Sequence, residues 1–223
     1  FGDVLDYLGG EPTTRAILLY IESIRRSRRF MSAARAAARN KPVLVIKAGR
    51  VAEGARAATS HTGALAGADE VYDSAFRRAG MLRVYEIDEL FDAAETLGTS
   101  LRLKGDRLAI LTNGGGPGVI ATDALIAGGG VLAQLSEETI QALNQVLPPT
   151  WSRGNPVDII GDATAERYRS ALTLLSRDPG IDALLVMYVP TAVTSSEEAA
   201  RAVIDVVRES RAGVLTSWLG RDG

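Results

Sequence analysis

The feature that most constrains this fold is an apolar run near the end of the chain. After its first residue, the stretch Asp182–Val189 (DALLVMYV) is apolar throughout. A strand with one solvent-exposed face alternates apolar and polar side chains, whereas a strand covered on both faces is apolar without interruption. Parallel sheets with helices on both faces contain strands of this kind, so the run predicts an α/β fold.

Strand and helix signals alternate through the second half of the chain. The predicted strands are Arg107–Thr112, Val131–Leu135, Val157–Ile160, Asp182–Val189 and Val214–Trp218. The predicted helices are Pro117–Ala127, a helix that Ser136 caps and Pro148 and Pro149 end, Ala165–Ser176, and a helix to about Glu209 that opens with the capping-box pair Ser195 and Glu198. Five strands separated by helices predict a doubly wound parallel sheet.

The first half repeats the alternation with fewer strands. The predicted strands are Ala16–Ile21, Val43–Lys47 and Leu82–Tyr85, and the predicted helices are Arg28–Arg39, Asp69–Ala79 and Glu89–Leu97. Because three strands make a thin sheet, we expect the opening strands of this domain upstream of residue 1. The stretch Arg102–Asp106 is the natural boundary, which gives two domains, residues 1–103 and residues 104–223.

Composition and charge exclude several classes of protein. The chain has no cysteine, which excludes disulfides and thiolate metal sites and permits a reducing, cytoplasmic compartment. A net charge of −2 gives no basic surface for nucleic acid, and no apolar segment is long enough to span a membrane. The arginine run from Arg25 to Arg29 has no aromatic residue within it and is interpreted as the solvated start of a helix.

The chain's single histidine, His61, lies in a long segment between a predicted strand and a predicted helix. Residues 48–68 are rich in glycine and alanine and follow the carboxyl end of strand Val43–Lys47. Open α/β sheets bind their ligands at that edge, and structureless loops of this length usually serve a function. The segment is therefore a candidate for the active site.

Four interpretations of His61 follow from the residues around it. It is a surface histidine without chemistry, a hydrolase base, a metal ligand or a covalent phosphoryl acceptor. The chain has no G-x-S-x-G nucleophile turn, which argues against a hydrolase. A lone histidine without cysteine supplies too few ligands for a metal. A neutral imidazole is a competent nucleophile near pH 7, which favours the phosphoryl acceptor and leaves the surface histidine as the alternative.

A glycine-rich turn in the second half is the candidate phosphate-binding site. Its residues Asn113, Gly114, Gly115, Gly116 and Gly118 join a strand to a helix start, where exposed amides and the helix dipole favour an anion. No Gly-Lys-Ser/Thr follows, so this is not a Walker A loop, and no acidic residue ends the next strand to bind a ribose. A tight turn without a ligand is the alternative.

Carboxylates supply the remaining candidates. Glu22 directly follows strand Ala16–Ile21, and it is interpreted either as a group that orients His61 or as a solvated loop residue. Asp158 and Asp162 could be taken for a magnesium pair, but two carboxylates alone rarely justify one. No metal site is assigned. The preceding Asn155 and Pro156 are as compatible with a turn as with a ligand role.

Five stretches of the sequence resemble the NDP-forming acyl-CoA synthetases, relatives of succinyl-CoA synthetase. They are ILLYIES (Ile17–Ser23), KPVLVIKAGR (Lys41–Arg50), SHTGALAG (Ser60–Gly67), LTNGGGPGV (Leu111–Val119) and NPVDIIGDAT (Asn155–Thr164). The resemblance implies two flavodoxin-like, succinyl-CoA-synthetase-like domains. It also implies that His61 is phosphorylated, that Glu22 orients it, and that the helix start at Asn113–Gly118 stabilises the phosphohistidine.

The family's reaction couples acyl-CoA, ADP and phosphate to free acid, CoA and ATP through an acyl phosphate. The resemblance therefore implies ATP or ADP, CoA and magnesium for the full enzyme, and a small carboxylic acid as substrate. It places a CoA-binding domain and an ATP-grasp domain outside this chain, on the same polypeptide or a second subunit, so the chain is expected to be catalytically incomplete. The identity of the acid, the choice of ADP or GDP and the existence of a homo-oligomer stay open.

A second family shares part of the resemblance. The stretches Ile17–Arg50 and Val214–Gly220 are similar to bacterial protein lysine acetyltransferases, which fuse a synthetase-like region to an acetyltransferase domain. Some of those proteins have lost the histidine, whereas this chain keeps His61. A regulatory acyl-CoA-synthetase-like region of such an acetyltransferase is therefore the alternative function.

Overall fold

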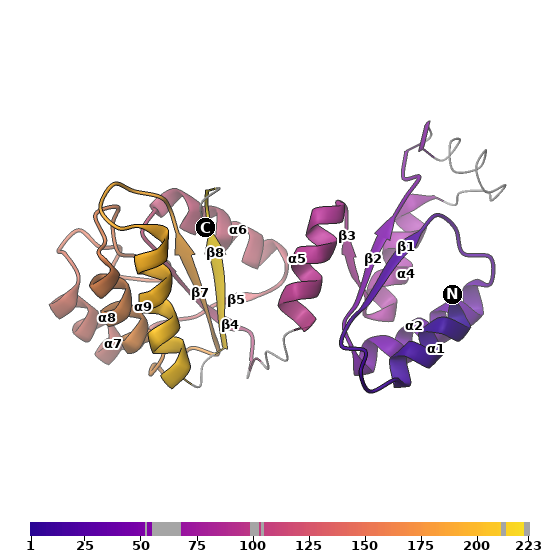
Figure 1. Ribbon diagram of the computed structural model, residues 1–223, viewed down its shortest axis with the longest axis horizontal. Coiled ribbons are helices and arrows are strands. Elements are labelled where there is room, and N and C mark those ends of the chain that lie inside the picture. The colour runs from indigo at the N-terminus through magenta and orange to yellow at the C-terminus, as the bar shows by residue number, and fades with distance from the viewer. Residues whose placement is uncertain (52, 55–67, 99–102, 104, 211–212, 221–223) are drawn as a thin grey trace. The chain divides into compact units, whose positions relative to one another are not determined.

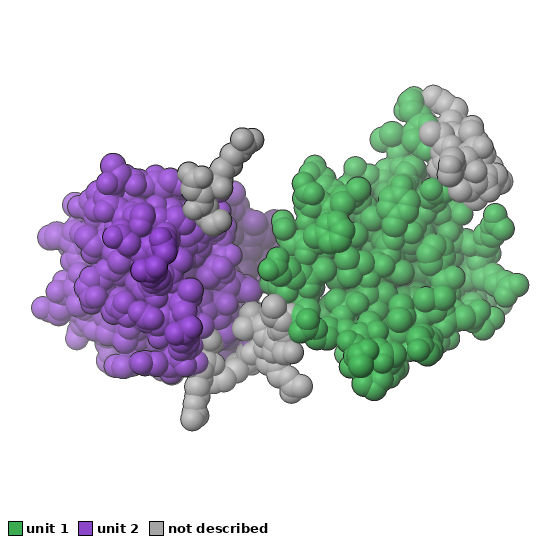
Figure 2. Space-filling model, viewed as in Figure 1, with its two compact units in different colours: residues 1–101 green, residues 102–223 purple. Residues whose placement is uncertain are grey.

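The computed structural model describes residues 1–51, 53–54, 68–98, 103, 105–210 and 213–220. The chain divides into two compact units, Phe1–Leu101 and Arg102–Gly223, whose division lies close to the predicted boundary after residue 103 (Figure 2). Each unit is a parallel sheet with helices on both faces, so the predicted α/β class is confirmed (Figure 1). No helix in the described ranges is both long enough and apolar enough to cross a membrane.

The first unit is built on three parallel strands in the order β1-β2-β3. Its elements are α1 (Gly2–Gly10), β1 (Ile17–Ile21), α2 (Ser27–Asn40), β2 (Val43–Lys47), α4 (Asp69–Ala79), β3 (Leu82–Val84) and α5 (Ile87–Gly98). Helices α1, α2 and α4 cover one face of the sheet and α5 covers the other (Figure 1).

The central strand β2 is buried along its whole length because both of its faces are covered. Val43 and Val45 pack in the larger core beneath α1, α2 and α4, whereas Leu44 and Ile46 pack with Leu90 of α5. Successive side chains of a strand point to opposite faces, so an uninterrupted apolar strand is what this position requires.

Helix α1 is absent from the sequence-based prediction. Its sequence contains three glycines, which normally lower helix propensity. Gly9 lies against α2, and a Cβ atom on Gly9 would come within 3.1 Å of Ala37 Cα. The close approach of two backbones therefore explains a glycine that local propensity alone would assign to a turn.

The second unit has a five-stranded parallel sheet with β5, β4, β7 and β8 in that order and β6 also paired with β4. Its elements are β4 (Arg107–Thr112), α6 (Gly115–Ala127), β5 (Val131–Leu132), α7 (Glu137–Val146), β6 (Val157–Asp158), α8 (Ala165–Leu175), β7 (Ala183–Tyr188), α9 (Ser196–Glu209) and β8 (Gly213–Trp218). The chain leaves β4 toward β5 and β6 on one side and reaches β7 and β8 on the other, which is the doubly wound arrangement. Helix α6 covers one face and α7, α8 and α9 the other (Figure 1).

Two predicted strands of this unit are shorter than expected, since β5 ends at Leu132 and β6 at Asp158. The reason for the first is the side chain of Asn155. Its amide donates to the carbonyls of Leu108 and Ala133, each at 2.9 Å, and its Oδ1 accepts from the Ile110 amide at 2.9 Å. One side chain thus replaces strand-to-strand hydrogen bonds between β4 and the chain beyond β5.

Candidate functional site

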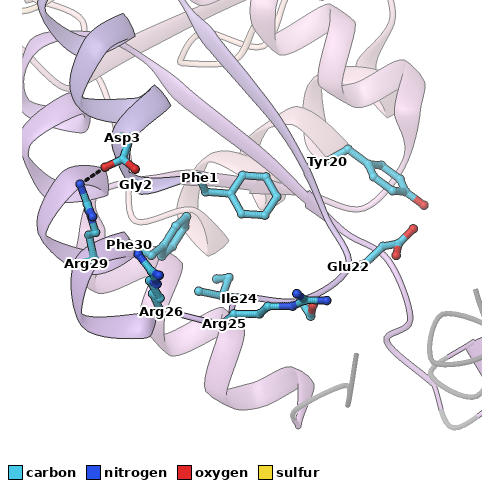
Figure 3. A pocket seen from close by; sticks show the side chains of 11 residues that line it. Phe1, Gly2, Asp3, Tyr20, Glu22, Ile24, Arg25, Arg26, Arg29 and Phe30 are labelled. Atoms are coloured by element: carbon cyan, nitrogen blue, oxygen red, sulfur yellow. Dashed lines mark ion pairs between the residues drawn. The ribbon is translucent and has the colours of Figure 1, made fainter. Parts of the chain in front are cut away.

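Glu22 lies at the carboxyl edge of the first sheet, directly after β1. The edge is defined there by the last register pair, Ile21 and Lys47, and by the Ala48 amide, which donates to the Ile21 carbonyl at 3.0 Å. The Glu22 side chain is half-buried and lines a cavity of about 580 Å³ (Figure 3). Glu22 therefore lies at the carboxyl edge of the sheet, where it was predicted, and its role at that edge stays a prediction.

The cavity beside Glu22 combines aromatic and cationic side chains. Phe1, Tyr20 and Phe30 supply rings, and Arg25, Arg26 and Arg29 supply guanidinium groups (Figure 3). Arg29 forms an ion pair with Asp3. Arg25 and Arg26 are exposed, as expected for a solvated helix start, but they also line the cavity that contains Glu22.

His61 lies outside the described residues, as does most of the segment that carries it. The two ends of that segment are described. It leaves the sheet after Lys47, the last residue of β2, and returns at Asp69, the first residue of α4. Both ends are rich in charge, and the Asp69 carboxylate accepts two hydrogen bonds from Arg83 Nη2, at 2.7 and 2.8 Å.

The described part of this edge includes a charged residue, Lys47, that the sequence pattern predicted only as the end of a strand. Lys47 is 2% exposed, although lysine is rarely buried. The sequence gives one indication of this burial, because Lys47 is the last residue of a strand that is otherwise wholly apolar. A lysine at such a point can be solvated or buried, and local sequence alone does not decide between them.

The glycine-rich turn of the second unit opens helix α6, with Gly114 as its N-cap residue. The Asn113 side chain is 3% exposed and exchanges hydrogen bonds with the Val189 backbone. The Gly114 amide donates to Thr112 Oγ1 at 3.0 Å, and the Gly118 amide donates to the Gly114 carbonyl at 3.3 Å. Gly115 and Gly116 are the first two residues of α6, so their amides have no acceptor within the helix.

Packing explains three of the four glycines in this turn. A Cβ atom on Gly114 would come within 2.7 Å of Val189, one on Gly115 within 2.9 Å of Asp158, and one on Gly118 within 3.0 Å of Thr112. A Cβ atom on Gly116 would meet nothing within 4 Å. Gly116 therefore has open space before it at the positive end of a helix, where an anion is favoured.

The two aspartates considered as a magnesium pair bind to the protein itself. Asp158 Oδ1 accepts from the Ile160 amide at 2.8 Å, and Asp162 forms an ion pair with Arg167. Across the described ranges, no group of three or more histidine, aspartate or glutamate side chains is arranged to hold a metal.

Two family models match the chain almost end to end. The model described as the succinyl-CoA ligase like flavodoxin domain matches residues 1–97, and the ligase-CoA domain matches residues 108–218.

The chain is 46% identical over 202 residues to acetate–CoA ligase [ADP-forming] I of Archaeoglobus fulgidus. The match covers 91% of this chain and 29% of that protein. It is 43% identical to the alpha subunit of acetate–CoA ligase [ADP-forming] I of Pyrococcus furiosus, over 93% of this chain and 45% of the subunit.

A solved structure is also similar over nearly the whole chain. It is the dinucleotide-forming acetyl-coenzyme A synthetase 1 of Ca. Korarchaeum cryptofilum, in complex with phosphate and ADP. The TM-score is 0.90 at 38% identity, and the match covers 99% of this chain and 48% of that chain. This chain thus spans less than half the length of each of these relatives.

Proposed function

Because this chain belongs to the ADP-forming acyl-CoA synthetase family, related to succinyl-CoA synthetase, we propose that it is the phosphohistidine-bearing part of an acid–CoA ligase. The whole enzyme interconverts acyl-CoA, ADP and phosphate with free acid, CoA and ATP. His61 carries the phosphoryl group between the acyl phosphate and the nucleotide. The observation that carries the proposal is the location of Glu22, one strand away from the point where the His61 segment leaves the sheet.

The residues of this chain have distinct roles in the proposed transfer. The neutral imidazole of His61 attacks the phosphorus of the acyl phosphate, the bond from phosphorus to the acyl oxygen breaks, and the carboxylic acid leaves as its anion. Glu22 accepts a hydrogen bond from the other ring nitrogen, which fixes the tautomer and stabilises the positive charge that develops. Phosphohistidine then transfers the phosphoryl group to ADP. The Gly115 and Gly116 amides stabilise the phosphate while it is bound.

Other parts of the enzyme complete this chemistry. We propose that a CoA-binding domain and an ATP-grasp domain, on the same polypeptide or a second subunit, bind CoA and ATP or ADP, as the partial coverage of the relatives supports. Magnesium is expected for the full enzyme, and we assign it to the nucleotide site of the ATP-grasp domain. A small carboxylic acid is the substrate, and a homo-oligomer and a cytoplasmic location stay predictions.

The alternative function, a regulatory region of a protein lysine acetyltransferase, is not favoured. The relatives described above are named as acetate–CoA ligases or as an acetyl-coenzyme A synthetase, and none of these is named as an acetyltransferase. Retention of His61 also supports a working phosphoryl carrier.

Labelling of the full-length enzyme with ATP that is radioactive at the γ-phosphate tests the proposal. We expect an acid-labile, base-stable label on the peptide of the native protein that contains His61, and none on that peptide in a His61→Ala variant, because residues 1–223 contain no second histidine. A Glu22→Gln variant should be labelled more slowly, by about 10- to 100-fold. The proposal fails if the native protein takes up no label or if the His61→Ala variant keeps it.

A further inference from the structure

Four arginines line one cavity at the C-terminal ends of helices α2 and α4. The cavity has a volume of about 420 Å³, and Arg35 and Arg39 of α2 and Arg77 and Arg78 of α4 border it. Its other lining residues are two alanines and Gly80, so the lining contains no carboxylate. The cavity is therefore surrounded by positive charge that its own walls do not balance.

The packing of the two helices brings these arginines together. Arg35 and Arg39 are four residues apart, and residues at this spacing are neighbours on one face of a helix. Small residues allow α4 to approach α2 closely, because Ala79 is buried in the core that the two helices share and a Cβ atom on Gly80 would lie 3.6 Å from Ala38 Cβ. Long side chains from both helices thus border the same space.

The arginines of this cavity differ from others in the chain by their lack of carboxylate partners. Within the described residues, Arg35, Arg39 and Arg78 form no hydrogen bond or ion pair, and Arg77 pairs with Asp73 on its own helix at 2.7 Å. Elsewhere in the described ranges, several arginines form ion pairs with carboxylates, namely Arg29, Arg83, Arg107, Arg167, Arg169 and Arg201.

The helix dipole accounts for only part of this charge. Arg39, Arg77 and Arg78 lie in the last turns of their helices, where cations offset the partial negative charge of the C-terminus. That partial charge is about half an elementary charge for each helix, which is far less than the charge of four guanidinium groups. Helix α2 has no acidic residue to supply the difference. Glu70 lines a neighbouring cavity with Arg35 and Arg78, but it forms no ion pair with either of them among the described residues.

We infer that this cavity binds a small polyanion with several linked phosphate groups, either an inorganic polyphosphate or the phosphate chain of a nucleotide. Planar guanidinium groups donate paired hydrogen bonds to phosphate oxygens, and a chain of phosphates can contact arginines on both helices at once. Helix α2 leads into β2 and α4 leads into β3, so the cavity lies at the amino edge of the sheet. Glu22 lies at the opposite, carboxyl edge, so the inference does not depend on the proposed phosphoryl transfer.

Modification of arginines by phenylglyoxal in the full-length enzyme, followed by mass spectrometry of its peptides, tests the site residue by residue. The probe is inorganic triphosphate at constant ionic strength. At about ten times its Kd it should slow the modification of Arg35, Arg39 and Arg78 by about tenfold, because only the unoccupied fraction reacts. Arg208 is the internal control, since it is exposed on α9, and its modification rate should not change.

A double variant, Arg35→Gln with Arg39→Gln, tests whether the two helices bind the anion together. Its Kd is taken from the dependence of Arg78 protection on the triphosphate concentration, so anions bound elsewhere on the enzyme do not contribute. We expect the Kd to rise by about tenfold or more, since hydrogen bonds to charged groups are lost. Both side chains are exposed, so the variant should fold, which its melting temperature checks. Arg208→Gln is the matched control and should keep the native Kd.

The same measurement with other anions defines the ligand class. Protection by ATP would support the inference and identify a nucleotide as the source of the phosphate chain, whereas protection by triphosphate alone would support an inorganic ligand. Equal affinity for inorganic phosphate would overturn the requirement for several linked phosphates, and equal protection by citrate would show that the arginines recognise charge alone. Protection of Arg208 as strong as that of Arg78, or an unchanged Kd in the folded double variant, would overturn the site itself.

Discussion

The side chain of Asn113 binds the backbone of Val189 in both directions. Its Nδ2 donates to the Val189 carbonyl at 2.9 Å, and its Oδ1 accepts from the Val189 amide at 2.8 Å. The contact extends the pairing of β4 with β7 beyond its last register pair, Thr112 and Met187. Asn113 therefore fixes the point where the chain leaves the sheet and turns into α6. In the proposed function, contact with the phosphate is assigned to the backbone amides that follow.

Replacement of Asn113 by alanine should destabilise the second unit. The Asn113 side chain is buried, and without it both polar groups of half-buried Val189 would lose their partner; each unsatisfied buried group costs about 1–3 kcal/mol. We expect the free energy of unfolding to fall by about 2–4 kcal/mol in urea titrations. Gln141→Ala is the control, because Gln141 is exposed on α7. Equal losses in the two variants would contradict this account of Asn113.

Substitutions at Gly116 should separate stability from phosphate binding. Helix α6 has no acidic residue in its first turn, and Gly116 faces open space. Gly116→Asp should therefore stabilise the helix by about 0.3–1 kcal/mol through the helix dipole. The same carboxylate should repel a phosphate and slow His61 labelling of the full-length enzyme by about tenfold or more.

Gly116→Asn is the matched control for that experiment, because it has the same shape without the charge. It should cause a much smaller loss of labelling than Gly116→Asp. If the aspartate variant is labelled as fast as the native enzyme, the start of α6 is not a phosphate site. Gly118→Ala should behave differently, since its Cβ would lie 3.0 Å from Thr112 and 3.4 Å from Pro156, and we expect it to destabilise the unit.

The second unit could be predicted almost element by element, because β7 is wholly apolar and two of its helices have side-chain caps at the predicted positions. Ser136 accepts from the Thr139 amide, and Ser195 forms a capping box with Glu198. The location of Glu22 also followed from the sequence, since the carboxyl ends of parallel strands share one edge.

The missed features depend on contacts between residues far apart in the chain. Gly9 of α1 is explained by its packing on Ala37, and the buried Lys47 has its Nζ 4.7 Å from the centre of the Tyr72 ring. The early end of β5 depends on Asn155, more than twenty residues away. None of these partners lies within the window over which local periodicity is informative.

The capping box at the start of α9 should contribute measurably to stability. The Glu198 amide donates to Ser195 Oγ at 3.3 Å, and the Ser195 amide donates to Glu198 Oε2 at 3.0 Å. Ser195→Ala should lower the free energy of unfolding by about 1 kcal/mol. Ser196→Ala, one position later in the first turn, should change it by less than about 0.5 kcal/mol. A stability loss in Ser196→Ala as large as that in Ser195→Ala would contradict the role of the cap.

Glu11 should make the stability of the first unit depend on acidic pH. Its carboxylate accepts hydrogen bonds from Thr13 Oγ1 at 2.8 Å, from Thr14 Oγ1 at 2.8 Å and from the Thr14 amide at 2.7 Å. The Thr13 hydroxyl, followed by the Thr14 hydroxyl and the two backbone amides, lowers the pKa of Glu11 from 4.5 to about 2. The folded state therefore favours the charged carboxylate.

The sign of the pH effect follows from that lowered pKa. The contribution of Glu11 is complete above pH 4.5 and declines as the pH falls from 4.5 toward 2, because the unfolded chain takes up the proton first. We expect the melting temperatures of the native protein and a Glu11→Gln variant to differ at pH 6 and to converge near pH 2. A variant with Thr13→Val and Thr14→Val lacks the hydroxyl donors and should show a smaller pH dependence than the native protein. A difference between native and Glu11→Gln that stays constant from pH 6 to pH 2 would show that these hydrogen bonds do not favour the charged form.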